Sequence, residues 1–208
     1  MKKYFIVAGE PSGDLHGSKL IKAIKHLNPN SSFMGHGGDS MRNEGMHIIE
    51  HVDSLAIMGF AEVLRHLPRM NKIMRNTVGA IERSKPDRVI LIDYPGFNLR
   101  LAKRLSPLKI PITYFILPQA WAWKQRRVEV LKRFIDQSIS IFPFENDWYK
   151  KHGLRVDYFG HPFVDIEHFN ETTKSFYKRH SLNINNPILT LLPGSRQQEV
   201  DRHWPIYL

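Results

Sequence analysis

The sequence predicts an α/β protein built on a Rossmann-like, doubly wound parallel sheet. Short runs rich in β-branched and aromatic residues alternate with helical patterns along the whole chain. Most of these runs are apolar on both faces, as strands covered by helices on two sides must be. The 208 residues, of which 42% are hydrophobic and 24% charged, suffice for one large globular domain or one and a half.

The expected elements follow from these local patterns. The first helix should follow Asp14, a favourable N-cap residue, and bury an apolar stripe that includes Ile21 and Leu27. Residues 47–51 match the zinc-protease pattern HxxEH, but their β-branched side chains favour an edge strand over the helix that the motif needs, so no metal site is expected. The predicted strands cover residues 4–8, 88–92, 112–117, 138–142, 156–159 and 188–192.

We expect three parts along the chain. Residues 1–170 form an N-terminal Rossmann-like domain, and the polar stretch 171–187 is the linker. The strand expected at 188–192 begins a further βα unit. Residues 188–208 are therefore expected to be the first strand and helix start of a second domain whose remainder is not in this chain.

Charge and composition restrict the classes of function. Thirty Lys and Arg against 20 Asp and Glu give a net charge of +10, which favours an anionic partner such as a nucleic acid, a phosphorylated metabolite or an acidic lipid surface. The cations are spread along the chain without a recognition motif, which argues against nucleic acid. The absence of Cys excludes disulfides. With no apolar run long enough for a signal peptide or a membrane span, a cytoplasmic location is expected.

Ligands of parallel α/β sheets bind beyond the carboxyl ends of the strands, so the residues directly after each predicted strand are the first candidates. The first such loop holds Glu10, Ser12, Gly13 and Asp14, where free backbone amides and the helix dipole favour an anionic or polar ligand. Its spacing is neither GxGxxG nor a P-loop. A tight turn with a helix cap explains this loop equally well.

Two later loops carry polar and aromatic side chains. Asp93 and Asn98 follow the second predicted strand, where a carboxylate can act as a general base or cap the next helix. Gln119, Trp121 and Arg126 follow the third predicted strand within PQAWAWKQRR. Two Trp beside several cations can form a sugar platform and a phosphate clamp, or they can be core anchors beside a solvated helix face.

The last candidate loop is LLPGSR, in which Gly194, Ser195 and Arg196 follow the sixth predicted strand. Glycine admits close approach of a ligand, serine and backbone amides donate hydrogen bonds, and arginine binds oxygens through two nitrogens. The segment therefore suits a diphosphate, although a structural turn is the alternative.

A helical stripe of apolar residues lies between residues 60 and 74, with Pro68 expected to divide it into two helices. The pattern fits a core-facing helix, or a helix that lies on an anionic bilayer surface because cations flank the stripe. The apolar residues that would contact the membrane are Phe60, Leu64, Leu67 and Met70, and the flanking cations are Arg65, Arg69, Lys72 and Arg75.

Eight motifs occur in order: VAGEPSGDLHG, GHGGDSM, LAIMGFAEVL, IDYPGFN, LPQAWAWKQRR, FPFE, GHP and LLPGSRQQEV. As a set they resemble the lipid-A-disaccharide synthases of Gram-negative bacteria. The resemblance implies the N-terminal half of a glycosyltransferase B fold, in which two Rossmann-like domains face each other across a cleft. It implies an inverting transfer, without metal or cofactor, from UDP-2,3-diacylglucosamine to 2,3-diacylglucosamine 1-phosphate (lipid X). The products are lipid A disaccharide 1-phosphate and UDP.

The resemblance also implies roles for the candidate residues. Asp93 is the first choice for the base that takes the proton of the acceptor 6-hydroxyl, and Glu10 and Asp14 are the second. The apolar stripe would dock the protein on the cytoplasmic face of the inner membrane. The implied substrate contacts are Ser12, Gly13, Asn98, Gln119, Trp121 and Arg126, with Gly194, Ser195 and Arg196 facing the UDP diphosphate.

Two alternatives remain open at this point. One is another UDP-sugar enzyme of the same fold, such as an N-acetylglucosamine 2-epimerase or the peptidoglycan transferase. The other is an inactive membrane-associated fragment, because members of the resembled family carry roughly as many residues again after LLPGSR. We accordingly expect little or no transfer by residues 1–208 alone.

Overall fold

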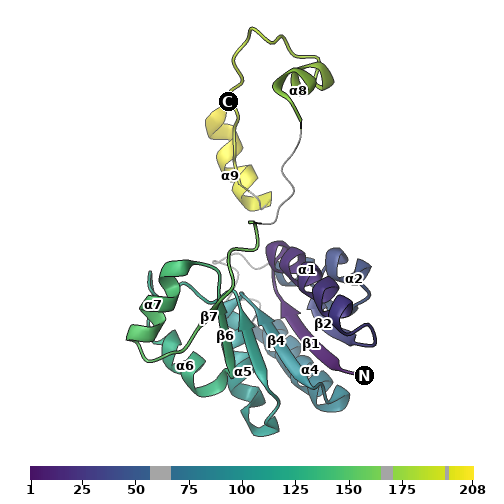
Figure 1. The fold of residues 1–208 in the computed structure, drawn as a ribbon, viewed down its shortest axis with the longest axis vertical. Coiled ribbons are helices and arrows are strands. Elements are labelled where there is room, and N and C mark those ends of the chain that lie inside the picture. The colour runs from purple at the N-terminus through teal and green to yellow at the C-terminus, as the bar shows by residue number, and fades with distance from the viewer. Residues whose placement is uncertain (57–66, 165–170, 195–196) are drawn as a thin grey trace. The chain divides into compact units, whose positions relative to one another are not determined.

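The computed structural model of the protein describes residues 1–56, 67–164, 171–194 and 197–208. The chain divides into two compact units, Met1–Asp165 and Ile166–Leu208. The described residues of the first unit contain one sheet with helices on both faces, and those of the second contain two helices (Figure 1). None of the described helices is both long and apolar enough to cross a bilayer.

All strand pairs of the sheet are parallel, and the strand order is β3-β2-β1-β4-β5-β6-β7. The order reverses at β1, which pairs with β2 on one side and β4 on the other. The strands are β1 Lys3–Ala8, β2 Ser32–Gly37, β3 His47–His51, β4 Arg88–Ile92, β5 Ile112–Phe115, β6 Gln137–Ser140 and β7 Asp157–Tyr158.

Helices connect these strands, and three of them begin with a proline soon after a strand ends. Proline suits the first turn because it lacks an N–H that would find no partner there. Those three are α1 Pro11–Leu27, α5 Pro95–Leu105 and α7 Pro143–Lys151. The others in the described part of the chain are α2 Asp39–Asn43, α3 Val52–Ala56, α4 Leu67–Ser84, the 3-10 helix Ser106–Leu108, α6 Arg127–Phe134, α8 Thr173–Arg179 and α9 Gln197–Tyr207.

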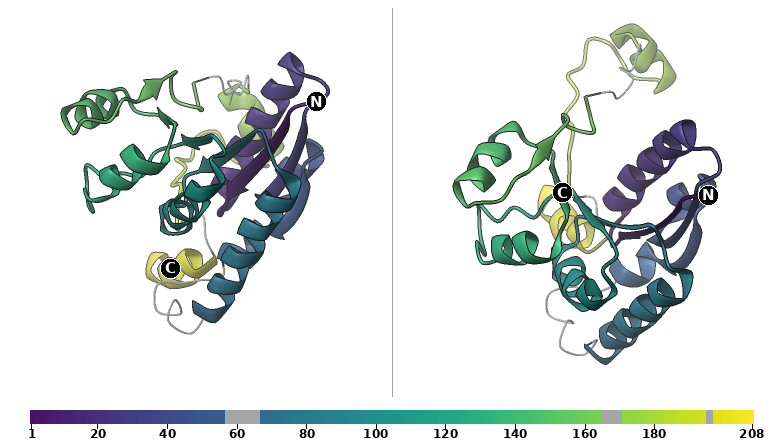
Figure 2. Two further views of the ribbon diagram at one scale, coloured as in Figure 1. Left: turned by 90° about the horizontal axis from the view of Figure 1, so that it is seen from below. Right: turned by 60° about the horizontal axis from the view of Figure 1, so that its bottom comes forward.

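The core lies on both faces of the sheet because successive side chains of a strand point in opposite directions. In β1, Phe5 and Val7 join a cluster formed with α4, α5 and α6, whereas Ile6 and Ala8 join a second cluster with α1 and α2. The helices on the two faces of the sheet are visible in Figure 2. This two-sided burial confirms the predicted doubly wound α/β fold and explains why the strands lack polar alternation.

The predicted strands agree with the structure in the first unit, with shorter ends for the later ones. Residues 88–92 match β4 to the residue, and 47–51 form the expected edge strand β3. The prediction for the first helix is wrong in two respects. Helix α1 begins at Pro11, so Asp14 lies inside it and is not its N-cap, and Leu27 at its end is 77% exposed.

In the second unit, the strand predicted over residues 188–192 is not formed. Residues 187–194 have no regular secondary structure, and Ile188 and Leu189 are exposed. A parallel strand needs a neighbouring strand for its hydrogen bonds, and the described residues of this unit contain none. Helix α8 lies within the stretch predicted as a linker, and α9 follows the LLPGSR segment.

Candidate active site

The reversal of strand order places the candidate site beyond the carboxyl ends of β1 and β4, where parallel α/β sheets form their ligand crevice. Ala8 of β1 pairs with Ile92 of β4, so Glu10 and Asp93 leave neighbouring strands at the same edge. Between them, the ring of Tyr94 lies against Gly9. A Cβ on Gly9 would come within 2.2 Å of this ring, so the approach requires glycine.

Asp93 and Tyr94 both have left-handed backbone conformations, with φ of 44° and 49°. Such conformations are strained for these residue types and persist only where the surroundings hold them. The Asp93 amide donates to the carbonyl of Phe115 at 3.0 Å, and its carbonyl accepts from the Tyr114 hydroxyl at 2.7 Å. The backbone that carries the candidate base is therefore fixed by β5.

Asn98 lies beneath this loop. Its side chain is fully buried, and its Nδ2 donates to the carbonyls of Val7, Ile92 and Asp93. These contacts join the ends of β1 and β4 to the Asp93 loop. The structure thus places Asn98, predicted as a substrate contact, as a support of the site.

Two tyrosines, the partly buried Tyr94 and the buried Tyr114, show how this edge affects ionisable groups. Burial raises the pKa of the Tyr94 hydroxyl, and the nearby Glu10 carboxylate raises it further. Burial likewise raises the pKa of Tyr114, with a further contribution from Asp93. Glu10 and Asp93 each therefore lie within electrostatic reach of a tyrosine at the switch point.

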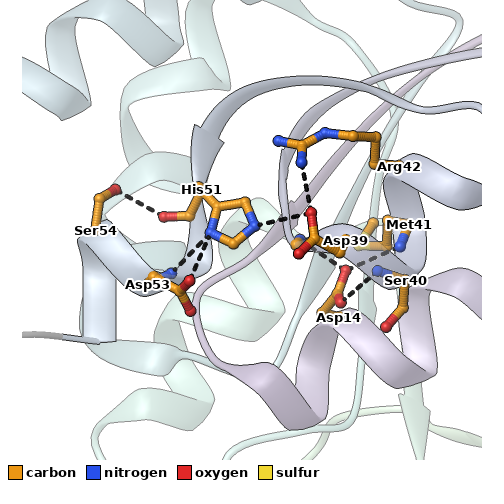
Figure 3. Close-up of polar contacts among 9 residues, drawn as sticks. Asp14, Asp39, Ser40, Met41, Arg42, His51, Asp53 and Ser54 are labelled. Carbon is orange, nitrogen blue, oxygen red and sulfur yellow. Dashed lines mark hydrogen bonds and ion pairs between the residues drawn. The ribbon is translucent and has the colours of Figure 1, made fainter.

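Asp14 is held by a different part of the fold. Its Oδ1 accepts hydrogen bonds from the amides of Gly38 at 2.7 Å and Met41 at 3.0 Å, and its Oδ2 accepts from Ser40 at 3.0 Å (Figure 3). These amides form the N-terminal turn of α2, so Asp14 on α1 caps the next helix. We call this contact the Asp14 cap. Gly13 beside it is buried, whereas Ser12 is exposed.

Two residues of the HxxEH pattern, Glu50 and His51, make polar contacts with α2 and α3. The ring of His51 lies between Asp39 and Asp53, at 3.6 and 3.2 Å from their carboxylates (Figure 3). Glu50 accepts a hydrogen bond from the Ser54 hydroxyl. Both aspartates are mostly exposed, and pairs of this kind contribute little to stability.

The aromatic loop after β5 lies along the same edge. The Nε1 of Trp121 donates to Glu145 at 3.0 Å, and Gln119 and Arg126 are exposed. Trp123 is half-exposed, with the Lys124 ammonium at 4.5 Å and the Arg127 guanidinium at 4.7 Å from the ring. Trp121 is thus anchored to the protein, while Trp123 presents the aromatic face beside the cations.

Sequence reasoning missed Glu145 and Tyr149, which lie four residues apart on α7. Glu145 is 1% exposed, and burial raises the pKa of its carboxyl while contacts with Trp121 and two backbone amides oppose this. The Tyr149 hydroxyl donates to the carbonyl of Pro118. The available signal was the FPFE motif, which places a glutamate in the first turn of a helix opened by proline.

A row of aromatic rings borders the site. Successive rings lie 5.1 to 5.7 Å apart between centroids, and Phe144 and Phe163 are about half exposed. At one end, burial lowers the pKa of His16, as do Lys19 and His161. In order, the row contains His16, Phe163, His161, Phe142, Phe144 and Trp121.

Several predicted residues belong to the second unit or lie outside the described residues. Ser195 and Arg196 lie outside the described residues, and Gly194, with φ of 138°, belongs to the second unit. Phe60 and Leu64 also lie outside the described residues, as does the side chain of Leu67.

The described part of the apolar stripe faces the core of the first unit. Met74 is buried on α4, and Met70 packs against the same cluster. This placement corresponds to the core-facing interpretation of the stripe at these two positions. Pro68 is the second described residue of α4, and the helix predicted before it lies outside the described residues.

Sequence comparison relates the chain to one family. A family model described as lipid-A-disaccharide synthetase matches residues 4–208. Two similar curated proteins are named lipid-A-disaccharide synthase. The one from Myxococcus xanthus is 38% identical, and the match covers 98% of this chain and 53% of the relative. The one from Alkalilimnicola ehrlichii is 40% identical, and the match covers 97% of this chain and 53% of the relative. The chain spans about half the length of the curated relatives it matches.

Structural comparison gives more distant neighbours that share the fold. S. aureus MnaA with UDP has a TM-score of 0.61 at 12% identity, over 87% of this chain and 52% of that one. UDP-GlcNAc 2-epimerase from Neisseria meningitidis has a TM-score of 0.57 at 12% identity, over 79% of this chain and 47% of that one. Acinetobacter baumannii MurG has a TM-score of 0.53 at 10% identity, over 82% of this chain and 48% of that one. At these identities the likeness concerns the Rossmann-like fold alone, which agrees with the predicted fold class.

Proposed function

The chain belongs to the lipid-A-disaccharide synthetase family, and from this membership we propose that the protein catalyses the disaccharide-forming step of lipid A biosynthesis. The 2,3-diacylglucosamine unit of UDP-2,3-diacylglucosamine is transferred to lipid X, giving lipid A disaccharide 1-phosphate and UDP. The observation that carries the proposal is the family match over residues 4–208. The carboxylates after β1 and β4 add a chemical reason for this reaction.

The proposed chemistry is an in-line displacement at the anomeric carbon of the donor. The acceptor 6-hydroxyl oxygen forms the new bond to this carbon while the bond to the UDP oxygen breaks. The hydroxyl proton passes to a carboxylate, and UDP leaves with the bonding electrons. Asp93 is our first choice for this base because its backbone is fixed in a strained conformation at the switch point. Glu10 on the neighbouring strand end is the second.

Asp14 is less suited to the role of base. Both of its oxygens accept amide hydrogens of α2, so proton uptake would weaken the Asp14 cap. We therefore assign Asp14 to the framework of the site.

We assign the acceptor side to the aromatic loop after β5. Lys124 and Arg127 beside the half-exposed Trp123 combine cations with an aromatic face, which suits a sugar phosphate such as lipid X. Gln119, Trp121 and Arg126 complete the set of proposed contacts, and Ser12 and Gly13 at the start of α1 offer backbone donors. Residues 194–196 remain the proposed ligands of the UDP diphosphate.

We further propose that the protein works at the cytoplasmic face of the inner membrane. The net charge of +10 favours an anionic lipid surface, and both proposed substrates carry fatty acyl chains. Because Met70 and Met74 face the core, contact with lipid would fall to the earlier part of the stripe, at Phe60, Leu64 and Leu67.

The test uses protein expressed from the complete open reading frame, radiolabelled UDP-2,3-diacylglucosamine and lipid X, with the disaccharide separated by thin-layer chromatography. Asp93→Asn is expected to lower kcat by about 100-fold or more. Asp147→Asn, at an exposed position of α7, is the matched control and should keep full turnover.

Two results would contradict these assignments. Full turnover by Asp93→Asn would remove Asp93 as the base and leave Glu10 to be tested in the same way. Conversion of nonacylated UDP-N-acetylglucosamine with no product from the acylated pair would favour an epimerase-type enzyme.

A further inference from the structure

Helix α7 holds the aromatic loop after β5 at three points. The Tyr149 hydroxyl donates to the carbonyl of Pro118, and Glu145 Oε1 accepts from Trp121 Nε1 at 3.0 Å. The ring of Phe144 packs edge-on against Trp121, with 5.1 Å between centroids. Residues 116–126 form turns and bends without regular secondary structure. Side-chain contacts such as these therefore set the shape of the loop.

The Glu145 carboxyl is the unusual member of this set. It is 1% exposed and receives one side-chain hydrogen bond, while its Oε2 has no hydrogen-bond partner among the described residues. Burying a carboxyl group with an unpaired oxygen is unfavourable, so such a group calls for a specific explanation. Burial correspondingly raises the pKa of this carboxyl.

A purely structural role would account for part of the arrangement. Glu145 is the third residue of α7, where a glutamate can bind the amide of the residue that precedes the helix and interact favourably with the helix dipole. This role needs no indole donor. It also does not require the side chain to connect α7 to a loop 24 residues earlier in the chain.

We propose that Glu145 is a positioning residue, which fixes the indole of Trp121 and through it the loop that receives the acceptor sugar. We call the contact between these two side chains the Glu145 clamp. The inference rests on the proposed function in one respect, that Trp121 meets substrate. The clamp itself depends only on the contacts described above.

The first experiment observes the clamp without any activity. The protein is labelled with 5-fluorotryptophan, and the 19F resonance of Trp121 is identified by its loss in Trp121→Phe. Glu145→Ala removes the acceptor and should shift and broaden this resonance, whereas Glu145→Gln keeps an acceptor oxygen and should leave the resonance narrow. Asp147→Ala, at an exposed position on the same helix, is the control and should change nothing.

An unchanged Trp121 resonance in folded Glu145→Ala would overturn the proposal. If Glu145→Ala does not fold, Glu145→Gln decides the matter by pH titration. The wild-type Trp121 resonance should then move as the Glu145 carboxyl gains its proton, and the Gln variant should lack this step. A titration step that is equal in both proteins would overturn the proposal as well.

The second experiment is a double-mutant cycle on kcat/KM, with the enzyme from the complete reading frame, UDP-2,3-diacylglucosamine and lipid X. Glu145→Ala and Trp121→Phe are each expected to lower kcat/KM by about 10- to 100-fold because the acceptor is misplaced. The double variant should lose little more than either single variant, since both changes break the same clamp. If Glu145 acts only as a helix cap, its effect persists in the Trp121→Phe background, which would contradict the proposal.

The two experiments separate failure of the clamp from failure of the proposed function. A wild-type enzyme that forms no disaccharide contradicts the proposed function. In that case the 19F comparison still confirms or overturns the Glu145 clamp.

Discussion

Asp14 and Glu145 are both buried carboxylates near the carboxyl edge of one sheet, but their partners differ. Asp14 accepts three backbone amide hydrogens from the start of α2. Glu145 accepts an indole hydrogen from Trp121 and also interacts with the backbone amides of Ile141 and Phe142, while its Oε2 has no hydrogen-bond partner among the described residues. The two groups are 6% and 1% exposed, so burial does not distinguish them.

The difference lies in the number and origin of the donors. Backbone amides are held in place by the secondary structure around them, so the Asp14 cap joins two parts of the framework. Glu145 has, besides backbone donors of its own helix start, a side-chain donor on an irregular loop, and through this donor the proposed Glu145 clamp would fix a part of the proposed site. The two carboxylates therefore differ in whether a side-chain donor from a loop joins the backbone donors, and not in burial.

The largest effect should come from removing the Asp14 cap. Asp14→Ala leaves the amides of Gly38, Ser40 and Met41 without their acceptor, and each unpaired buried donor costs about 1 to 3 kcal/mol. We expect the free energy of unfolding in urea to fall by about 4 kcal/mol or more. Asp53→Ala, in which an exposed carboxylate near α2 is removed, should change it by less than about 1 kcal/mol. Similar losses in both variants would show that the Asp14 cap does not stabilise the framework more than an exposed carboxylate does.

A second prediction uses pH to measure how closed the other face of the sheet is, which α4 covers and which lies opposite to the helix that carries Asp14. His36 on β2 is buried, with its Nε2 at 2.9 Å from the Thr77 hydroxyl oxygen, and burial lowers its pKa to about 4. The Thr77 hydroxyl donates its hydrogen to the carbonyl of Ile73, so the Nε2 of His36 donates to the Thr77 oxygen.

Because the unfolded chain binds this proton near pH 6.5 and the folded chain only near 4, the free energy of unfolding should fall as the pH drops through this interval. The difference amounts to at most about 3 kcal/mol at pH 4 relative to pH 7. His36→Gln keeps a donor toward Thr77 and should lose this part of the pH dependence in urea unfolding measured across the interval. If the free energy of unfolding depends on pH equally in the wild type and in His36→Gln, the surroundings of His36 are open to solvent.

A third prediction concerns Gly9, which follows β1 and lies against the ring of Tyr94. Gly9→Ala places a Cβ about where the Tyr94 ring lies, at 2.2 Å from its nearest atom, so the ring must move. We expect a loss of about 2 kcal/mol in the free energy of unfolding, the range found for overpacked cores. Gly96→Ala, where nothing lies within 4 Å of the new atom, is the control and should be neutral or slightly stabilising. A neutral Gly9→Ala would mean that Tyr94 is not fixed.

The smallest effect on stability should come from Glu145→Gln. The amide oxygen can still accept from Trp121, so the free energy of unfolding at pH 7 should change by less than about 1 kcal/mol. The pH dependence of the free energy of unfolding should differ more clearly between Glu145→Gln and the wild type. Since burial raises the pKa of Glu145, the folded protein binds this proton more tightly, and wild-type stability should fall as the pH rises above the usual value of 4.5. Thermal unfolding of both proteins between pH 4 and 7 tests whether the variant lacks this decrease.

Local patterns predicted the fold class and most strands because burial on both faces leaves a clear mark on the sequence. The central strand β4 was predicted to the residue. Strand β2 was missed because its sequence, SFMGHG, is rich in glycine and polar residues. Gly35 has φ of 140°, and a Cβ there would come within 2.0 Å of the Ile6 carbonyl, so the residue that weakens the pattern is required by the fold.

The site was predicted only where its residues directly follow strands. Glu10 and Asp93 were found in this way, as was the loop of Trp121. The role of Asp14 was not, because its donors lie 24 to 27 residues further along the chain and no local pattern connects them. Glu145 was missed for the same reason, since glutamate in the first turn of a helix is ordinary until its burial and its contact with Trp121 are known.

Helix α2 has only five residues, far fewer than the roughly 12 to 15 at which an isolated helix becomes marginally stable in water. It can persist only after β1, α1 and β2 have assembled and Asp14 has reached it. The amide hydrogens of Gly38, Ser40 and Met41 should therefore exchange with deuterium only when that assembly opens. Their exchange rates would therefore report how often the N-terminal half of the sheet opens, and they can be measured without an added label.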